Sequence, residues 1–189
     1  MRNTFLVLAI FVYNFAEAQF IKEKSINAQI GYGISSPYDS EDDIANGGFF
    51  VQGELVLQVN SWLDIRPYLG LISTSSDGKD LNGNETDEKA ESKAFFIGGK
   101  ARIRIPIKWV APYLELGIGT SIGKFETFTA FDDIEKNGII HHIPLSIGLE
   151  LGRNNNVDLA FTYYYQPSVK QFVGALALGV SIPFKSKSE

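Results

Sequence analysis

Hydrophobic residues near the C-terminus of the chain follow a strict two-residue period. Small residues such as Ala175, Ala177 and Gly179 fill the alternate positions. Side chains of a β-strand point alternately to opposite faces, and a tilted strand crosses a bilayer in about 9–11 residues. The segment therefore has the length and the two different faces of a wall strand in a membrane β-barrel. Its large apolar residues are Phe172, Leu176, Leu178, Val180, Ile182 and Phe184.

The same period recurs seven more times along the chain. No helical 3.6-residue pattern of useful length interrupts it, so the fold class is all-β. We predict an eight-stranded antiparallel up-and-down transmembrane β-barrel. Pro144 falls well inside the sixth strand, where we expect a bulge or a late strand start, because proline cannot donate to a ladder. The predicted strands are 25–35, 48–60, 63–73, 93–106, 109–122, 139–152, 156–166 and 172–184.

Connection lengths indicate which environment the apolar face meets. Segments 36–47, 74–92 and 123–138 are long and 167–171 is moderate, whereas the remaining joints are very short. This alternation puts every long loop at one end, which is typical of bacterial outer-membrane barrels. A soluble ligand-binding calyx has the same strand period with its apolar face inside. Its exterior should be about a quarter to a third charged, and here the polar face is mostly Gly, Ala, Ser and Thr.

The first 18 residues have the features of a cleaved export signal. Arg2 precedes an apolar run over 5–15, and Ala16-Glu17-Ala18 offers small residues for cleavage before Gln19. The run is about half the length that a membrane-spanning helix needs. We therefore expect a signal peptide at 1–18 and one barrel domain at 19–189.

Composition narrows the function classes. The chain has 189 residues, a formal net charge of −5 and no cysteine. A modestly acidic exported protein is a poor nucleic-acid binder. Without cysteine there is no structural disulfide, no thiolate metal site and no lipid-modified N-terminal cysteine.

The exported N-terminus, the eight strands and the terminal pattern Val180-Ser181-Ile182-Pro183-Phe184 together resemble the small OmpA/OmpX-type barrels of Gram-negative outer membranes. The resemblance covers the whole mature chain. It implies an outer-membrane, porin-like barrel that contacts membrane lipids and lipopolysaccharide. It also implies that the assembly machinery recognises the C-terminal strand. Family members have envelope-structural or surface-interaction roles, so the resemblance implies a non-enzymatic protein of that kind.

Charged residues on the inward face predict a plugged, charge-paired lumen. Eight strands leave an interior that side chains can fill, and buried charges need partners. A two-residue turn at 107–108 would set Lys100 opposite Glu115 and Arg102 opposite Tyr113. A gated ion path through the same residues is the alternative. The predicted lumen network comprises Glu54, Arg66, Lys100, Arg102, Arg104, Glu115, Glu150 and Asp158, joined by Asp64.

A lipid-modifying enzyme is the other alternative, because His142, Ser146 and Glu150 share one inward strand face. Four residues at roughly 3.3 Å each separate the histidine from the serine by about 13 Å. A nucleophile and its base must lie within hydrogen-bond reach. We therefore expect no catalytic residues and no cofactor.

The predicted external loops are strongly acidic. Within the second, Asp80, Asn82, Asn84, Thr86, Glu88 and Glu91 occupy the ligand positions of an EF-hand-like calcium loop. Glu85 stands where that motif has its turn glycine, and strands replace the flanking helices. The loop is therefore either a solvated acidic segment or a site for divalent cations.

Overall fold

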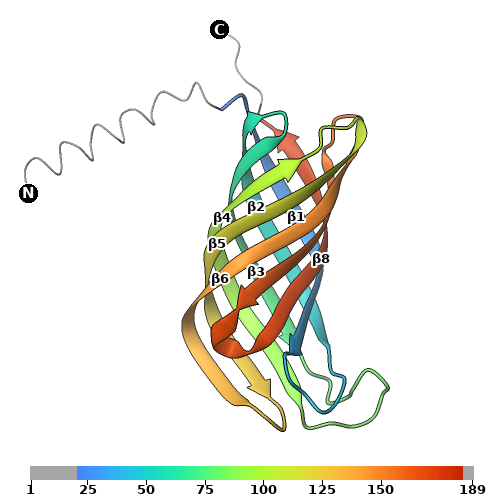
Figure 1. The fold of residues 1–189 in the computed structure, drawn as a ribbon, viewed down its shortest axis with the longest axis vertical. Coiled ribbons are helices and arrows are strands. Elements are labelled where there is room, and N and C mark those ends of the chain that lie inside the picture. The colour runs from blue at the N-terminus through green and yellow to red at the C-terminus, as the bar shows by residue number, and fades with distance from the viewer. Residues whose placement is uncertain (1–20, 185–189) are drawn as a thin grey trace, which may run out of the picture.

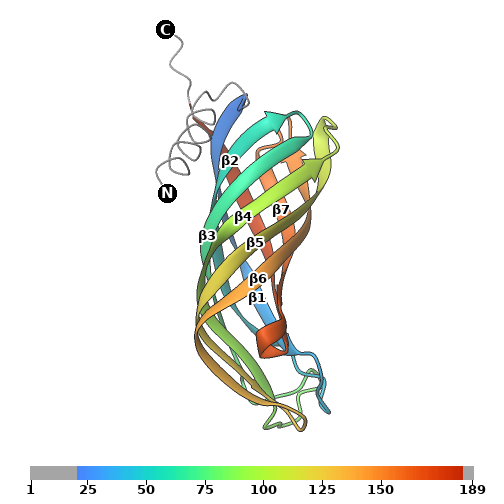
Figure 2. The ribbon, with the colours of Figure 1, turned by 60° about the vertical axis from the view of Figure 1, so that its left-hand side comes forward.

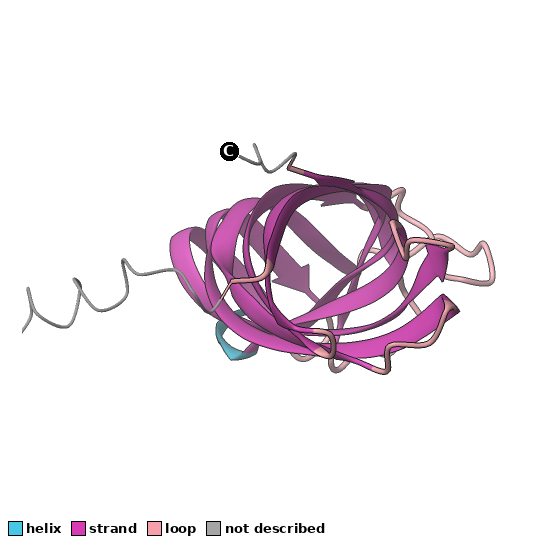
Figure 3. Ribbon diagram, turned by 90° about the horizontal axis from the view of Figure 1, so that it is seen from above, coloured by secondary structure: helices cyan, strands magenta, loops and turns pink. Residues whose placement is uncertain are grey.

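The computed structural model describes residues 21–184, which form one closed barrel of eight antiparallel strands. Each strand pairs with its neighbour in the chain, and β8 pairs with β1 to close the wall (Figures 1 and 3). This confirms the predicted fold class. The expected signal peptide and the tail 185–189 lie outside the described residues. The strands are β1 (Glu23–Pro37), β2 (Asn46–Asn60), β3 (Leu63–Ser75), β4 (Lys89–Arg104), β5 (Trp109–Phe128), β6 (Asp133–Gly152), β7 (Val157–Gln166) and β8 (Gln171–Pro183).

The barrel is polar inside and apolar outside. Ile118 on the outer wall is 75% exposed, whereas Arg102 in the interior is 0% exposed. Large aliphatic residues cover the outer face of all eight strands, and amides, hydroxyls and charges lie inside. This distribution matches a barrel with a lipid-facing exterior and is the reverse of a calyx with an apolar pocket.

Short turns and long loops lie at opposite ends of the barrel, as the connection lengths predict. The start of β1, the end of β8 and the short turns share one end (Figure 1). Trp62 and Trp109, the two tryptophans, are exposed residues at this end. Phe49, Phe95 and Tyr165 are exposed on the outer wall near the loop end. The two sets of aromatics are placed like the interfacial girdles of membrane barrels.

The third long connection differs from the prediction. Residues 123–138 are mostly strand, because β5 and β6 continue as a hairpin beyond the end of β7 and leave only 129–132 between them (Figure 2), and β4 pairs with β5 as far as Phe128. Charged residues make this segment resemble a loop in the sequence, but it keeps a two-residue period in which Phe125 and Thr127 point inward. Phe125 packs in a buried cluster with Val169, and Thr127 donates a hydrogen bond to the Val169 carbonyl at 2.8 Å.

Val169 belongs to η1 (Pro167–Val169), a single 3₁₀ turn between β7 and β8. Among residues 21–184, no helix is long and apolar enough to cross a membrane.

The predicted register between β4 and β5 is wrong by two residues. Lys100 pairs with Gly117 and Arg102 with Glu115, because β4 ends at Arg104 and four residues form the turn before Trp109. Pro106 lies within that turn, and Ile105 donates its N–H to the Pro112 carbonyl. The prediction of a two-residue turn rests on alternation alone, and alternation does not reveal at which residue the pairing of β4 with β5 stops.

Pro144 does not produce a bulge or a late start. The β5–β6 register is the same on both sides of it, with Leu116 opposite Leu145 and Gly119 opposite His142. Only the intervening positions, Gly117 and Ile118, lack ladder partners on β6. The ladder is therefore interrupted locally, because proline has no N–H to donate.

Leu116→Arg tests the lipid-facing assignment, since this exposed residue lies midway along the wall portion of β5. An arginine near the bilayer midplane costs about 2–4 kcal/mol, so the folding free energy into lipid vesicles should fall by that amount. Leu81→Arg is the control, because Leu81 is also exposed but lies in a loop. Equal folding free energies for the two variants would contradict the assignment.

Candidate functional site: the lumen network and the loop platform

All eight predicted lumen residues, together with Asp64, come together in the half of the barrel nearer the short turns. They project from β2 to β7, and β4 supplies three of the four basic groups. On the inner faces of β1 and β8, small or amide side chains such as Ala177 and Asn27 leave room for them. We call these nine residues the lumen network. Five are acidic and four are basic, and each basic group contacts at least two carboxylates.

Arg102 contacts three carboxylates and one aromatic ring of the interior. Its Nε donates to Glu115 Oε1 at 2.7 Å, and its Nη1 donates to Glu150 Oε1 and Asp158 Oδ2, both at 2.7 Å. The guanidinium also stacks on Tyr113, with 3.5 Å between its central carbon and the ring centroid. Tyr113 in turn donates its hydroxyl to Asp158. One fully buried side chain therefore ties β4 to β5, β6 and β7.

Lys100 and Arg66 extend the network around the barrel. Lys100 Nζ donates to Glu115 Oε2 at 2.6 Å and to Glu54 Oε1 at 2.7 Å. Lys100 thus reaches Glu115 diagonally although the predicted register was wrong. Arg66 bonds Glu54 at 3.0 Å and also contacts Asp64 and Glu150.

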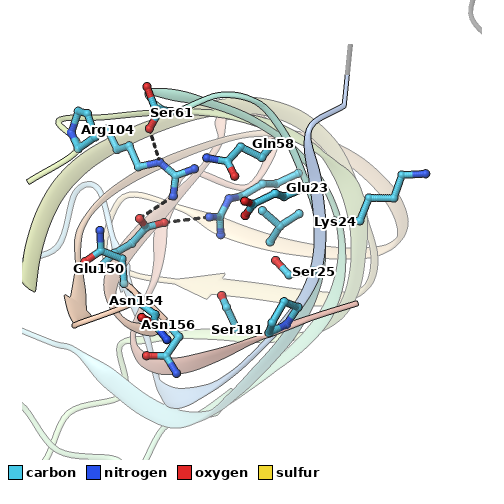
Figure 4. Close-up of a pocket in the computed structure, with 15 residues that line it drawn as sticks. Glu23, Lys24, Ser25, Gln58, Ser61, Arg104, Glu150, Asn154, Asn156 and Ser181 are labelled. Atoms are coloured by element: carbon cyan, nitrogen blue, oxygen red, sulfur yellow. Dashed lines mark hydrogen bonds and ion pairs between the residues drawn. The ribbon is translucent and has the colours of Figure 1, made fainter. Parts of the chain in front are cut away.

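The network ends in a recess of about 420 Å³ at the short-turn mouth. Figure 4 shows Arg104 and Glu150 pointing toward each other there, joined at 2.7 Å. Arg104 also bonds the Ser61 carbonyl and Asp64, which anchors the network to the β2–β3 turn. The charged residues therefore form the floor of this mouth.

An aromatic layer, not anticipated from the sequence, lies on the loop side of the charges. Phe96 lies 4.9 Å from Tyr164 and 5.9 Å from Phe50 between ring centroids. Tyr164 donates its hydroxyl to Gln52 at 2.7 Å, and Gln52 donates to Glu54 at 2.7 Å, so the two layers are bonded. The sequence signal for this layer is a pair of adjacent aromatic residues, as in Phe49-Phe50 and Phe95-Phe96, because such a pair places one ring on each face of the strand.

The three residues of the enzyme alternative have separate partners. His142 bonds the Tyr68 hydroxyl through Nε2 at 2.6 Å and Ser121 through Nδ1 at 2.8 Å. Ser146 bonds Thr162 at 2.9 Å, and Glu150 belongs to the lumen network. His142 is thus adjacent to a serine, Ser121, but the pair is buried and its other ring nitrogen faces a tyrosine in place of a carboxylate.

At the opposite end, Glu88 joins three loops into one loop platform, formed by residues 38–45, 76–88 and 129–132. Its carboxylate accepts the backbone N–H of Ala130 at 2.7 Å, of Asp42 at 3.2 Å and of Glu41 at 3.4 Å. Thr86 adds a hydroxyl bond to Asp42, also across two loops. Partial burial raises the pKa of Glu88, but these N–H donors outweigh it and hold the pKa below the ordinary glutamate value.

The calcium-loop residues are not brought together. Asp80 accepts hydrogen bonds from Asn82 and Asn84 within its own turn, and Glu91 in β4 accepts the Ser76 N–H. Glu88 is occupied by the loop contacts. Among residues 21–184, no group of three or more His, Asp or Glu side chains could hold a metal ion.

Comparisons with known proteins identify the architecture. The family model for the outer membrane protein beta-barrel domain matches residues 4–184. The crystal structure of Neisserial surface protein A, NspA, aligns with a TM-score of 0.56 at 17% identity, covering 85% of this chain and 97% of that one. No curated protein sequence matches the chain.

Two further solved barrels are similar at lower TM-scores. Ail of Yersinia pestis, in complex with the heparin analogue sucrose octasulfate, gives 0.48 at 18% identity, covering 86% of this chain and 99% of that one. The outer membrane protein OprG of Pseudomonas aeruginosa gives 0.48 at 11% identity, covering 86% and 97%.

Lys100→Met tests whether the lumen pairs act as a buried unit. Removing one partner of a buried ion pair costs about 3–5 kcal/mol, so the unfolding free energy in lipid vesicles should drop by that amount. The double variant with Glu115→Gln should lose less than the sum of the single losses. Lys89→Met is the control, because Lys89 pairs with Glu126 at the same 2.6 Å but is partly exposed, and Glu126 keeps Lys124 as a second partner, so the loss should be about 0–1 kcal/mol. Strict additivity would show that Lys100 and Glu115 do not interact.

Acidification should release the loop platform. Because the folded pKa of Glu88 is depressed, its stabilisation is complete above the unfolded pKa of about 4.3 and is lost as pH falls through the lower folded value. The amide proton shift of Ala130, followed by NMR in micelles, should titrate in that range. Glu88→Gln should abolish the titration, and Glu85→Gln in the same loop should preserve it. A titration that persists in Glu88→Gln would assign it to another group.

Proposed function

Because the chain belongs to the outer membrane protein beta-barrel domain family, we propose that it is a non-enzymatic outer-membrane protein with a closed lumen and a surface-interaction role. Its barrel acts as an anchor for the loop platform on the cell exterior. The short-turn end then faces the periplasm. The lumen network is the single observation that carries this proposal.

Two stacked layers support a closed lumen. The charged layer fills the periplasmic half with side chains that bond one another across the barrel, and the aromatic layer fills the space beyond it. An ion entering this interior would have to displace carboxylates and guanidinium groups from partners at 2.6–3.0 Å. Breaking such buried pairs costs several kcal/mol, which favours a plug over an ion path.

The loop platform supports a role in surface contact. Its three segments, 38–45, 76–88 and 129–132, contain ten acidic residues and one basic residue, which is more negative than the chain's net charge of −5. Leu81 and Phe131 are exposed among these acids. Charge of one sign steers encounters with partners of opposite charge, and exposed apolar side chains add contact energy.

The same arrangement supports the expected envelope partners. The apolar outer wall fits membrane lipids and the chains of lipopolysaccharide, and the acidic loops could draw divalent cations from the surrounding surface without a preformed cage. Phe184 follows directly on β8 and remains half-exposed, as an aromatic signal read by the assembly machinery should be. The buried, carboxylate-free surroundings of His142 and Ser121 support a non-enzymatic protein.

A closed lumen predicts that the purified barrel produces no discrete channels in planar lipid bilayers. Phe96→Ala combined with Lys100→Ala should remove one side chain from each layer and introduce small, irregular currents. Leu178→Ala on the outer wall is the control and should stay silent, because it leaves the interior unchanged. Stable, ohmic channels in the unmodified protein would establish an ion path.

The proposed orientation can be tested by single-cysteine labelling, because the chain has no native cysteine. Asp80→Cys in the loop platform should react with a membrane-impermeant maleimide on intact cells. Asn154→Cys in the β6–β7 turn should react only after the outer membrane is permeabilised. Asn154 is exposed and Asp80 is partly exposed, so a reagent on the matching side of the membrane can reach either position. The reverse pattern of labelling would show that the barrel has the opposite orientation and would refute the surface role of the loops.

A further inference from the structure

A groove of about 660 Å³ runs along the outer wall where β4, β5, β6 and β7 approach the loop end. Its sides are the exposed residues Ile97, Ile118, Ile143 and Tyr165. Pro167, the first residue of η1, closes the loop end. The groove lies within the apolar belt and reaches the level of the outer aromatic residues, so an outer-leaflet lipid is the molecule that meets it.

Missing side chains create the groove. Gly99 points outward, and a Cβ added there would meet no atom within 4 Å. Gly98 and Gly119 pair across β4 and β5, and their missing side chains leave space inside for the Tyr68 hydroxyl and His142. The adjacent gap in the β5–β6 ladder at Ile118 further loosens the wall. The lumen residue His142 consequently contributes to the floor of a groove that opens outward.

A polar pair borders this otherwise apolar groove. Thr120 Oγ1 and His141 Nδ1 lie 3.3 Å apart on the outer face, which leaves the other ring nitrogen of His141 without a partner among the described side chains. In a lipid environment, polar groups gain most from a ligand that can hydrogen-bond. The pair is therefore placed to meet a hydroxyl, amide or ester next to an acyl chain.

We propose that this groove binds one acyl chain of an outer-leaflet glycolipid of the lipid A type, with the chain's hydroxyl or amide linkage bonded to Thr120 and His141. This site rests on the orientation proposed above and makes the expected contact with lipopolysaccharide specific. The apolar sides and the polar pair near the loop-end aromatics match a chain that descends from a head group at the membrane surface.

Gly99→Phe should fill the groove, and Gly53→Phe is its matched control. Both glycines face outward with no atom within 4 Å of an added Cβ, but Gly53 lies on β2 away from the groove. The folded protein in mild detergent is titrated with lipid A or with a phosphatidylglycerol, and bound lipid is counted by native mass spectrometry. One lipid A should bind to the unmodified protein and to Gly53→Phe, with at least about tenfold weaker binding in Gly99→Phe, which corresponds to 1.4 kcal/mol.

A second variant pair separates filling of the groove from loss of its polar partner. Thr120→Val with His141→Phe keeps the surface apolar and should weaken lipid A binding without affecting heat stability of the barrel. Equal lipid A binding by both glycine variants, or equal retention of phosphatidylglycerol, would overturn the proposal. A dimer mass in place of a lipid adduct would assign the groove to a second copy of the chain. Surface labelling at Asp80→Cys reads orientation separately, so the proposed function can stand if this site fails.

Discussion

Mutual neutralisation of charges inside the barrel is the constraint on which the rest of the structure depends. Five carboxylates and four basic groups occupy a space that the strands close off from the membrane. Each isolated ion would cost several kcal/mol to bury, so the groups must lie within bonding distance of one another. Arg102 satisfies three carboxylate contacts from β4, which fixes the inner faces of β5, β6 and β7 relative to it.

Neighbouring features follow from this requirement. Long basic side chains on β4 can reach across the interior only because the facing strands carry small residues such as Ala177. The aromatic layer covers the loop side of the charges, and Gln52 joins the layers by bonding Tyr164 and Glu54. Glycines at positions 98 and 119 admit the Tyr68 and His142 side chains and thereby thin the wall. The groove on the outside is thus a consequence of how the inside is filled.

The sequence predicts the fold well because a period of two assigns each residue to a face, and the lipid and the lumen demand opposite chemistry. This pattern predicts the eight strands, the face on which each residue lies and the residues of the lumen network. The pattern does not predict the register, because a shift of two residues leaves the alternation unchanged. The sequence therefore places Lys100 opposite Glu115, whereas Arg102 occupies that position in the structure. The β5–β6 extension is not predicted, because its charged residues make the segment resemble a loop. The aromatic layer is not predicted either, because adjacent aromatic residues place rings on both faces of a strand. The loop platform depends on contacts between distant segments through Glu88, which no local pattern reveals.

Exchange of arginine side-chain protons with water tests the central claim most directly. NMR of the folded protein in micelles can follow the Nε–H groups of Arg102 and of Arg153, which is exposed in the β6–β7 turn. Because Arg102 is fully buried and its Nε donates to Glu115 at 2.7 Å, its proton should exchange orders of magnitude more slowly than that of Arg153. Equally fast exchange of the two protons would show that water moves freely through the lumen and that the charges are not locked in a plug.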